Sequence, residues 1–363
     1  MSQLLGSNIR LARLFSGLSL NDLGELLGKS KQYLSRVETG AEPVSTTLEA
    51  ALVEQLGVLP EFLRHIDPMP LTEEQCHFRK QLTTKVALRQ VARARGEMLK
   101  RLVLVLDEYL DLPEYSIAET DPSSDEAIER GAEICRSEWG LGFGPISNIT
   151  RVAENAGAVV MRVNGLANEV DAVSFATKRP VIALNGSKES VCRARFGIAH
   201  ELGHFALHIG VLTGDRLTET QANRFASAFL LPRASFLSES YKALRRSRLN
   251  WDGLSELKLR WGVSKAALLY RGRQLGVFSD DQVRAGFITL RRHGEAIAEN
   301  EDRYMPPETP EVVSEGLQIL KDQLGVPLAA VARKMYVQPR VLEDLLGYSP
   351  SEYSGRVVNL FNS

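Results

Sequence analysis

Apolar residues recur at helical spacing through the first 66 residues, and small polar residues stand where each stretch begins. Residues 17–40 place a tight turn at Gly28 between two such stretches, an arrangement typical of a helix-turn-helix. Serines in N-cap positions and a proline suited to a first turn mark the helix starts. The pattern predicts five short helices: 4–15, 20–27 after Ser19, 31–38 after Ser30, one opened by Ser45 and one opened by Pro60.

The two helices of this motif separate apolar from polar positions. Residues 1–66 hold six Lys and Arg against seven Asp and Glu, a weak charge for a DNA binder. A helical bundle that makes protein contacts is therefore the alternative to a DNA-binding domain. The expected core is Leu20, Leu23, Leu26, Leu27, Leu34 and Val37, and the expected DNA-binding set is Lys29, Ser30, Lys31, Gln32, Tyr33, Ser35 and Arg36.

Residues 67–117 are predicted to be a helical connector. Pro68 and Pro70 break the chain, and residues 73–109 have the pattern of one long helix. Its middle is strongly basic, which favours a solvated face of an interdomain helix. A phosphate-contacting arm beside the helix-turn-helix is the second interpretation. The cations are Arg79, Lys80, Lys85, Arg89, Arg93, Arg95, Lys100 and Arg101, against Glu97 alone.

The pattern changes to mixed α and β in residues 118–289, which we expect to form a third domain. We interpret the strand at 171–177 as a sheet edge, to which an extended peptide could add by backbone pairing. Helices are expected at 125–139, 146–155, 189–208, 218–229 and within 261–275 after Ser264, and strands at 158–163, 171–177 and 180–185.

Residues 290–363 are predicted to be a small helical module. Helices are expected at 316–324 and 328–335, and residues 326–346 have helix-turn-helix spacing. Any helical hairpin gives that spacing, so we favour a packing or partner-binding role. The fold class is therefore multidomain and mainly α, with one α/β (α+β) domain.

Bulk composition is that of an ordinary globular protein, with 363 residues, 44% hydrophobic, 25% charged and a net charge of −1. Three widely spaced cysteines argue against a disulfide framework. The start of the chain lacks the apolar run of a signal peptide, and the longest apolar stretch is too short for a membrane span. These features predict a cytoplasmic protein without membrane contact.

The segment 200–204, His-Glu-Leu-Gly-His, carries the clearest chemistry. On a helix its two histidines share one face and can bind one Zn²⁺, while Glu201 can act as general base on an activated water. A hydrolytic zinc site needs a third protein ligand. Glu219 is the best candidate, because it lies on a second helix whose small alanines allow close approach. The predicted ligands are His200, His204 and Glu219; such ligands also accept Mn²⁺ or Fe²⁺.

Other polar residues near this segment have less certain roles. His208 continues the i+4 stripe, but a helix rises about 6 Å over four residues, so we assign it a supporting or packing role. Asp215 is another carboxylate, although a loop is a poor support for a ligand. An oxyanion would need a further donor. The candidates are Tyr270, Tyr241, His208 and Arg271, of which Tyr270 is the first to test.

Two family resemblances rest on these motifs. Residues 1–66 resemble the helix-turn-helix domain of the Xre/Cro/C1-repressor family, although Gly24 stands where that family usually has alanine. Residues 140–278 resemble the ImmA/IrrE metallopeptidases through PVIALN, RFGIAHELGHFALH, ETQANRFASAFLLP and WGVSKAALLYRGRQLG. They depart from it at Gly197, Ile198 and Gln221. The resemblance implies a zincin-like fold, the same three metal ligands and Glu201 as the catalytic glutamate.

The resemblances also imply a function. Characterised ImmA/IrrE members cleave helix-turn-helix repressors at one site. We therefore expect a zinc-dependent, site-specific endopeptidase that cuts a regulatory protein, a repressor or itself, and binds double-stranded DNA through residues 1–66; a homodimer is compatible with this. The alternative is a transcriptional regulator whose zincin domain senses a metal, ligand or partner without turnover, in a toxin–antitoxin, prophage or defence locus.

Overall fold

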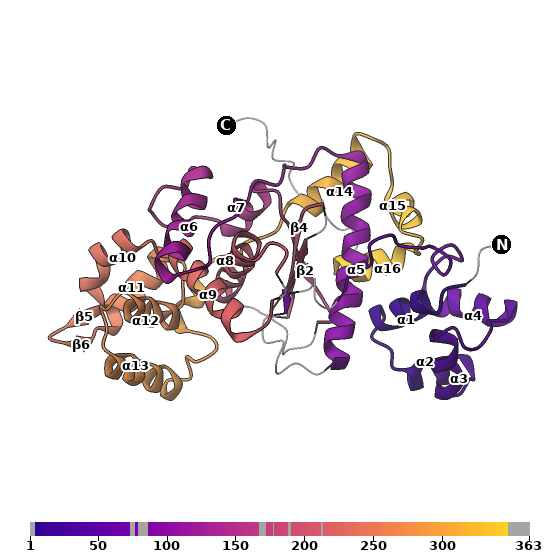
Figure 1. Cartoon of the computed structure of the whole chain (residues 1–363), viewed down its shortest axis with the longest axis horizontal. Helices are drawn as coiled ribbons and strands as arrows, with labels where there is room; N and C mark the ends of the chain where they lie inside the picture. The colour runs from indigo at the N-terminus through magenta and orange to yellow at the C-terminus, as the bar shows by residue number, and fades with distance from the viewer. Residues whose placement is uncertain are drawn as a thin grey trace.

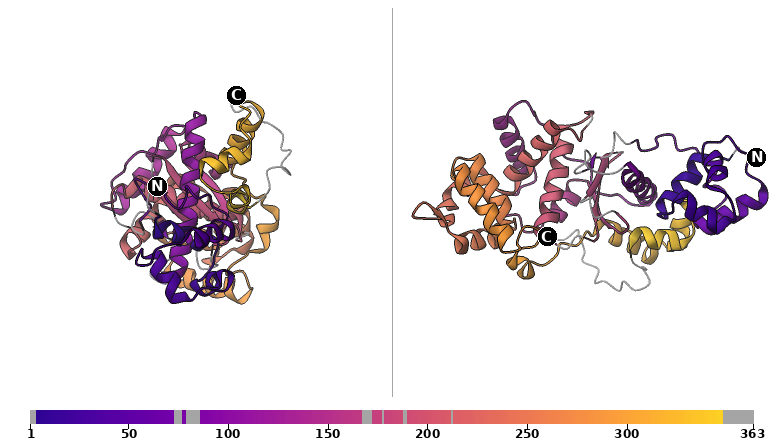
Figure 2. Two further views of the ribbon diagram at one scale, coloured as in Figure 1. Left: turned by 90° about the vertical axis from the view of Figure 1, so that its right-hand side faces the viewer. Right: turned by 90° about the horizontal axis from the view of Figure 1, so that it is seen from below.

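The fold centres on a small sheet between two helical bodies, and the whole molecule is elongated (Figures 1 and 2). The structure is a computed structural model that describes residues 4–72, 77–78, 86–166, 172–176, 178–187, 190–211 and 213–347. In Figure 1 the N-terminal helices lie to the right, helix α5 (Val86–Tyr109) stands beside the sheet with the C-terminal helices around it, and the other helices lie to the left. Among the described residues, no helix is both long and apolar enough to cross a membrane.

The N-terminal domain contains the predicted helix-turn-helix. Its helices are α1 (Gly6–Phe15), α2 (Leu20–Leu27), α3 (Lys31–Glu38) and α4 (Thr46–Leu56). The predicted N-caps at 19, 30 and 45 all accept a backbone N–H, and Gly28 takes the left-handed conformation at φ 61°. Two expectations are wrong: the segment after Pro60 forms turns instead of a fifth helix, and Leu26 is 54% exposed.

Helix α5 begins later than the pattern predicts. Residues 77–78 are not helical, because His77–Phe78 form strand β1. The rest of 73–85 lies outside the described residues, and this segment includes the predicted cations Arg79, Lys80 and Lys85.

Three cations in the middle of α5 are buried against the N-terminal domain and the residues that follow it. Lys100 is buried and bonds Asp67 and Glu97, both at 2.7 Å. The guanidinium of Arg95 lies 4.9 Å from the Phe15 ring centroid, and that of Arg101 lies 4.4 Å from the Phe62 centroid. Both interpretations of the basic stretch, a solvated face and a phosphate-contacting arm, are therefore wrong for these three residues, because the helix runs between two packed bodies.

The sheet has the strand order β1-β3-β4-β2. Strand β2 (Val159–Val163) is parallel to β4 (Pro180–Asn185), while β3 (Ala172–Ala176) is antiparallel to β4 and to β1. Strand β1 lies opposite Val173 and Ser174. The prediction of an open edge along 171–177 is therefore wrong at these two positions; residues 171 and 177 lie outside the described part.

Alternate residues of the strands enter two separate hydrophobic cores. One face, here called the α5 face, packs against α5 and the C-terminal helices. The other, called the α8 face, packs against helix α8 (Val191–Leu207). The α5 face is Val159, Met161, Val163, Val173, Phe175, Val181 and Ala183, and the α8 face is Val160, Ala172, Ser174, Ile182 and Leu184.

Helices on the α8 side form most of the second body. A segment after residue 292 folds back on it, where Lys258 and Lys265 form buried ion pairs with Glu299 and Glu295. The elements are α6 (Asp125–Glu138), α7 (Ile149–Asn155), α8, α9 (Arg216–Leu230), α10 (Arg233–Glu239), η1 (Ser240–Ala243), β5 (Leu244–Arg245), β6 (Arg248–Leu249), α11 (Trp251–Trp261), α12 (Lys265–Gln274), α13 (Asp280–Arg292) and η2 (Asn300–Tyr304).

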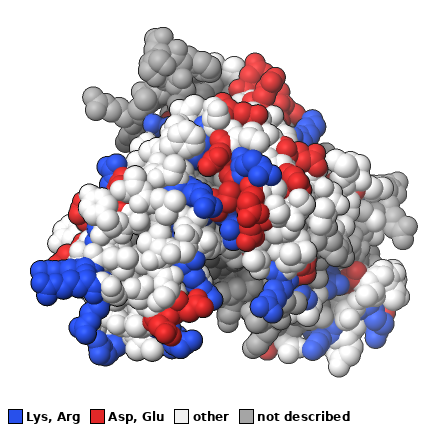
Figure 3. Space-filling model, turned by 60° about the vertical axis from the view of Figure 1, so that its left-hand side comes forward, with Lys and Arg blue, Asp and Glu red and all other residues white. Residues whose placement is uncertain are grey.

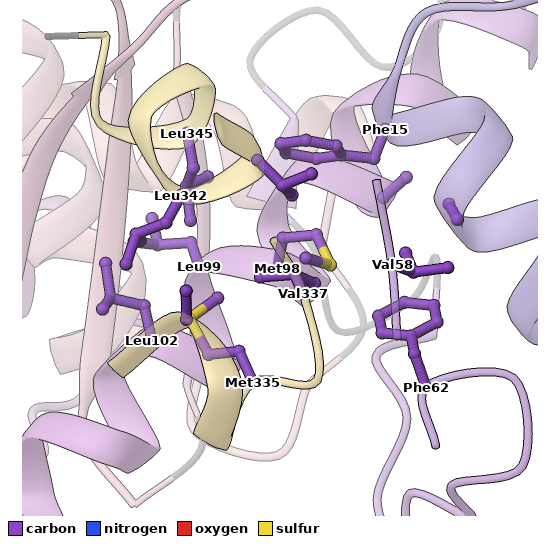
Figure 4. Packing of buried hydrophobic residues seen from close by; sticks show 14 of the residues in the cluster. Phe15, Val58, Phe62, Met98, Leu99, Leu102, Met335, Val337, Leu342 and Leu345 are labelled. Atoms are coloured by element: carbon purple, nitrogen blue, oxygen red, sulfur yellow. The ribbon is translucent and has the colours of Figure 1, made fainter. Parts of the chain in front are cut away.

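The C-terminal helices join the N-terminal domain to the sheet. Helices α14 (Val312–Asp322), α15 (Leu328–Lys334) and α16 (Pro339–Leu346) pack against α5, and α14 and α16 also contact β2. Val58 and Val337 form an antiparallel bridge, flanked by hydrogen bonds from Leu59 N to Tyr336 O (2.8 Å) and from Gln338 N to Gly57 O (2.7 Å). Figure 4 shows Val58, Phe62, Met335 and Val337 in one cluster with residues of α5.

Candidate metal centre

Helix α8 positions the His-Glu-Leu-Gly-His segment against a second helix. Ser190 caps α8 by accepting a hydrogen bond from the backbone N–H of Arg193. Gly203 lies where helix α9 passes closely, because a Cβ there would be 3.1 Å from Phe225 and 3.2 Å from the Ala222 carbonyl. This close packing brings the start of α9, with Glu219, beside the two histidines.

The three predicted metal ligands converge. One ligand atom each from His200, His204 and Glu219 lie within 4.8 Å of one another. The two Nε2 atoms are 3.0 Å apart, and the Glu219 carboxylate oxygens lie 3.6 Å from His200 Nε2 and 3.4 Å from His204 Nε2. Both histidines are buried, while Glu219 is partly exposed. This two-histidine, one-carboxylate set fits the ligands of a hydrolytic zinc site.

Hydrogen bonds on the far side of the rings fix the tautomers. Gln221 Nε2 donates to the Pro122 carbonyl (2.9 Å), so its Oε1 faces His208 Nε2 at 2.9 Å as an acceptor. His208 Nε2 therefore carries the proton, and its Nδ1 accepts from His204 Nδ1 at 3.0 Å. His200 Nδ1 donates to Asn223 Oδ1 at 3.1 Å. Both Nε2 atoms then present lone pairs toward Glu219, as metal ligation requires.

The electrostatics agree with neutral ligands. Burial, together with the neighbouring His208, lowers the pKa of His204 to about 3. Burial also lowers the pKa of His208. Because His204 is neutral near pH 7, its contact with Glu219 is not an ion pair, and its nitrogen needs no deprotonation before binding a metal.

Glu201 lies fully buried on α8, next to the two histidines in sequence. One of its carboxylate oxygens, Oε2, accepts a hydrogen bond from the Ser174 hydroxyl of β3. Ser174 is the polar member of the α8 face, so the alternation of β3 aims it at α8. Sequence reasoning missed it, although a single serine in the apolar strand AVSFA was a usable signal.

The remaining candidates have other contacts. Arg271 is fully buried and donates to Glu129 (2.8 Å) and to the Leu231 carbonyl (2.9 Å), so its assignment as an oxyanion donor is wrong. Asp215 accepts backbone hydrogen bonds as the N-cap of α9, which excludes it as the third ligand. Tyr270 is 54% exposed with its ring 5.0 Å from Phe287, and Tyr241 is 70% exposed. The structure does not bring either tyrosine to the three ligands.

His208 has the supporting position that helix geometry predicts. It ends α8 and contacts His204 from behind, through the nitrogen that does not face Glu219. Asn223 supports His200 in the same way. Asn223 was visible in the sequence as the residue one helical turn after Glu219, but its role depends on how α9 packs on α8.

The outward surface of the helix-turn-helix keeps its predicted polar character. The seven predicted DNA-contacting residues are exposed, except Tyr33 and Ser35, which are partly buried. Ion pairs of Arg13 with Glu38 and of Arg64 with Glu49 use two of the seven acids and two of the six cations, so the net charge of residues 1–66 is unchanged. Gly24 is a packing requirement, since a Cβ there would be 2.6 Å from the Lys29 carbonyl. Figure 3 shows a face toward the other end of the molecule, where cations and anions are mixed as well.

Comparison with known families covers both bodies of the molecule. Residues 4–66 match the model of a helix-turn-helix domain, and residues 153–272 match that of the IrrE N-terminal-like domain, a peptidase family. No curated protein matches the chain. The first match implies DNA binding, and the second implies a metallopeptidase-like domain with a zinc-type site. The chain therefore matches the architecture of the ImmA/IrrE family with a helix-turn-helix domain at its N-terminus.

Proposed function

We propose that this protein is a zinc-dependent, site-specific endopeptidase of the cytoplasm that cleaves a repressor-type regulatory protein and is directed by its own DNA-binding domain. The observation that carries the proposal is the convergence of His200, His204 and Glu219 beside Glu201. A zinc ion held by the three ligands would supply Lewis-acid activation of water and of a scissile carbonyl. Helix-turn-helix proteins are the proposed substrates because the family resemblance implies them.

The chain's own residues would perform the proton transfers. The Glu201 carboxylate would accept the proton of the attacking water and deliver it to the leaving amine. The Ser174 hydroxyl, which bonds Glu201 Oε2, would hold that carboxylate in place. Asn223 and His208 would keep the two imidazoles oriented for the metal.

The Glu201→Gln variant tests this function. It keeps the ligands and the shape of the site but removes the base, so cleavage should fall at least about 100-fold. Proteomes of cells carrying wild type or the variant, under DNA-damaging or prophage-inducing stress, would reveal the substrate as a protein cut only by wild type. Mass spectrometry of the native protein should find equal zinc in both. Unchanged cleavage by the variant would refute the mechanism.

A second candidate is a regulator that senses a metal or partner without turnover. The complete burial of Glu201 favours it, because a buried base is not directly open to substrate. Wild-type gene regulation by Glu201→Gln, together with operator binding by the N-terminal domain, would support this function over proteolysis.

DNA binding can be tested separately on α3. Lys31 and Arg36 are exposed on it, so the Lys31→Ala and Arg36→Ala variants should weaken DNA binding for all sequences. If each side chain contacts one phosphate, each variant should lower the slope of log affinity against log salt by about 1. Arg291→Ala, at an exposed position on α13, is the control. An unchanged affinity and slope for the α3 variants would favour a protein-contact role.

A further inference from the structure

Strand β1 pairs with the part of β3 that contacts Glu201. His77 lies opposite Ser174 and Phe78 lies opposite Val173 in antiparallel register. Ser174 is also the residue of β3 that hydrogen-bonds Glu201. A segment of the connector thus borders β3 at the position where the strand contacts the candidate base.

Both edges of β3 are used at this position. Strand β4 pairs with one edge along the whole of β3, with Ile182 opposite Ser174 and Ala183 opposite Val173. Strand β1 pairs with the other edge at the same two residues. An extended substrate could pair with β3 there only through the backbone groups that face β1. Binding of β1 and of such a substrate is therefore mutually exclusive.

The contact of β1 is weak in itself but favoured by its attachment. A ladder of two residues offers few hydrogen bonds, each worth about 0.5–1.5 kcal/mol net. The strand is part of the same chain as α5, which packs against β3, so its effective concentration at the edge is on the order of millimolar. A separate peptide that pairs with β3 as strongly as β1 does must therefore exceed that concentration before it displaces β1.

We propose that β1 occupies the substrate-binding edge of its own chain, so that the metal centre accepts an extended protein segment only when β1 leaves. This inference rests on the proposed function, since it assigns the edge of β3 to substrate. It identifies the competing ligand as an extended polypeptide strand and places the control of access in the connector between the DNA-binding domain and α5.

A binding experiment in the Glu201→Gln background tests this proposal without hydrolysis. The probe is a fluorescein-labelled synthetic peptide of residues 72–84, measured by anisotropy against the full-length protein. The double change His77→Pro and Phe78→Pro removes two backbone donors from β1. The matched control, His77→Ala with Phe78→Ala, keeps those donors. We expect the proline variant to bind the probe at least about tenfold more tightly than the control, and faster amide exchange in its residues 172–176.

The opposite change locks the strand. Phe78→Cys with Val173→Cys places two thiols at opposed positions, in a chain whose Cys76 is changed to serine. The oxidised form should not bind the probe, and reduction should restore the level of the unlocked protein. Equal probe binding by the control, proline and locked proteins would overturn the proposal. The proposal would also be overturned if a probe with proline at positions 77 and 78 bound as tightly as the unchanged probe.

These outcomes are separate from those of the proposed function. Absence of hydrolysis by the wild-type protein on every substrate would refute the peptidase function, but the binding results would still show whether β1 covers the edge. Conversely, all variants could bind the probe equally while cleavage still depends on Glu201. This result would support the peptidase function and refute the proposal that β1 covers the edge of β3.

Discussion

The two faces of the sheet come from the same strands, and both are mainly apolar, but the α8 face includes a polar residue. On the α5 face every described residue in the core is apolar, and the face is covered by α5 and the C-terminal helices. The α8 face includes Ser174, which bonds Glu201, and is covered by the helix with the metal ligands. The neighbouring residues Val173 and Ser174 of β3 thus serve packing and the candidate site, respectively. A register shift of one residue would exchange these roles.

The largest expected effect comes from breaking the α5 face. Phe175 is fully buried there, so Phe175→Ala should reduce the free energy of unfolding by about 3–5 kcal/mol. Urea denaturation should show the loss both in tryptophan fluorescence, which reports the α8 side, and in DNA binding, which reports the N-terminal domain. Ile288→Ala, at a position 58% exposed, should change stability by less than about 0.5 kcal/mol. A loss confined to one signal would mean that the two bodies unfold independently.

The next largest effect is on the pH dependence of stability, and it concerns a residue that links α7 to α14. Glu154 on α7 is buried and accepts backbone hydrogen bonds from Glu311 and Val312 at the start of α14, both at 3.1 Å. Burial raises its pKa to about 7. Between pH 4.5 and 7 the folded protein keeps a proton that the unfolded chain has lost, so stability falls as pH rises, by about 3 kcal/mol in total.

The Glu154→Gln variant should remove this pH dependence. It should equal wild type in stability near pH 4.5 and exceed it by up to about 3 kcal/mol at pH 8, since glutamine stays neutral. Thermal unfolding across pH 4.5–8 gives the comparison, with Glu25→Gln at an exposed position as control. Parallel curves for wild type and Glu154→Gln would contradict the assignment.

The smallest expected effect is a loss of activity when the polar residue of the α8 face is changed. Ser174→Ala removes a hydrogen bond to a carboxylate, and we expect about a tenfold loss in kcat/KM. Because the hydroxyl stabilises the ionised carboxylate, the acidic limb of the pH–rate profile should move to higher pH. Ser174→Thr, which keeps a hydroxyl, should recover most of the activity, and Ser238→Ala on the surface should change nothing. A lower rate with an unmoved pH profile would indicate only a packing role for Ser174.

The sequence predicted the elements whose chemistry depends on local spacing. The ligands His200 and His204 lie one helical turn apart, and Glu219 lies on the next helix, so their convergence follows from two amphipathic patterns. The caps of the helix-turn-helix were equally local. These features need no knowledge of how distant segments pack.

Non-local packing explains what the sequence could not supply. Strand β1 has only two residues and is defined by its pairing with β3, almost 100 residues later. The cations of α5 look like a solvated face until Phe15 and Phe62 are known to lie beside Arg95 and Arg101. Likewise, Arg271 was an oxyanion candidate until its pairing with Glu129 became visible.

The antiparallel bridge between Val58 and Val337 has a consequence for the synthesis of the chain. About 280 residues separate the two valines, so at about 5–20 residues per second the ribosome makes the second roughly 15–60 s after the first. During that interval Val58 and Phe62 lack the C-terminal part of the cluster in which they are buried. The nascent DNA-binding domain therefore presents an apolar surface to its surroundings until translation is almost complete.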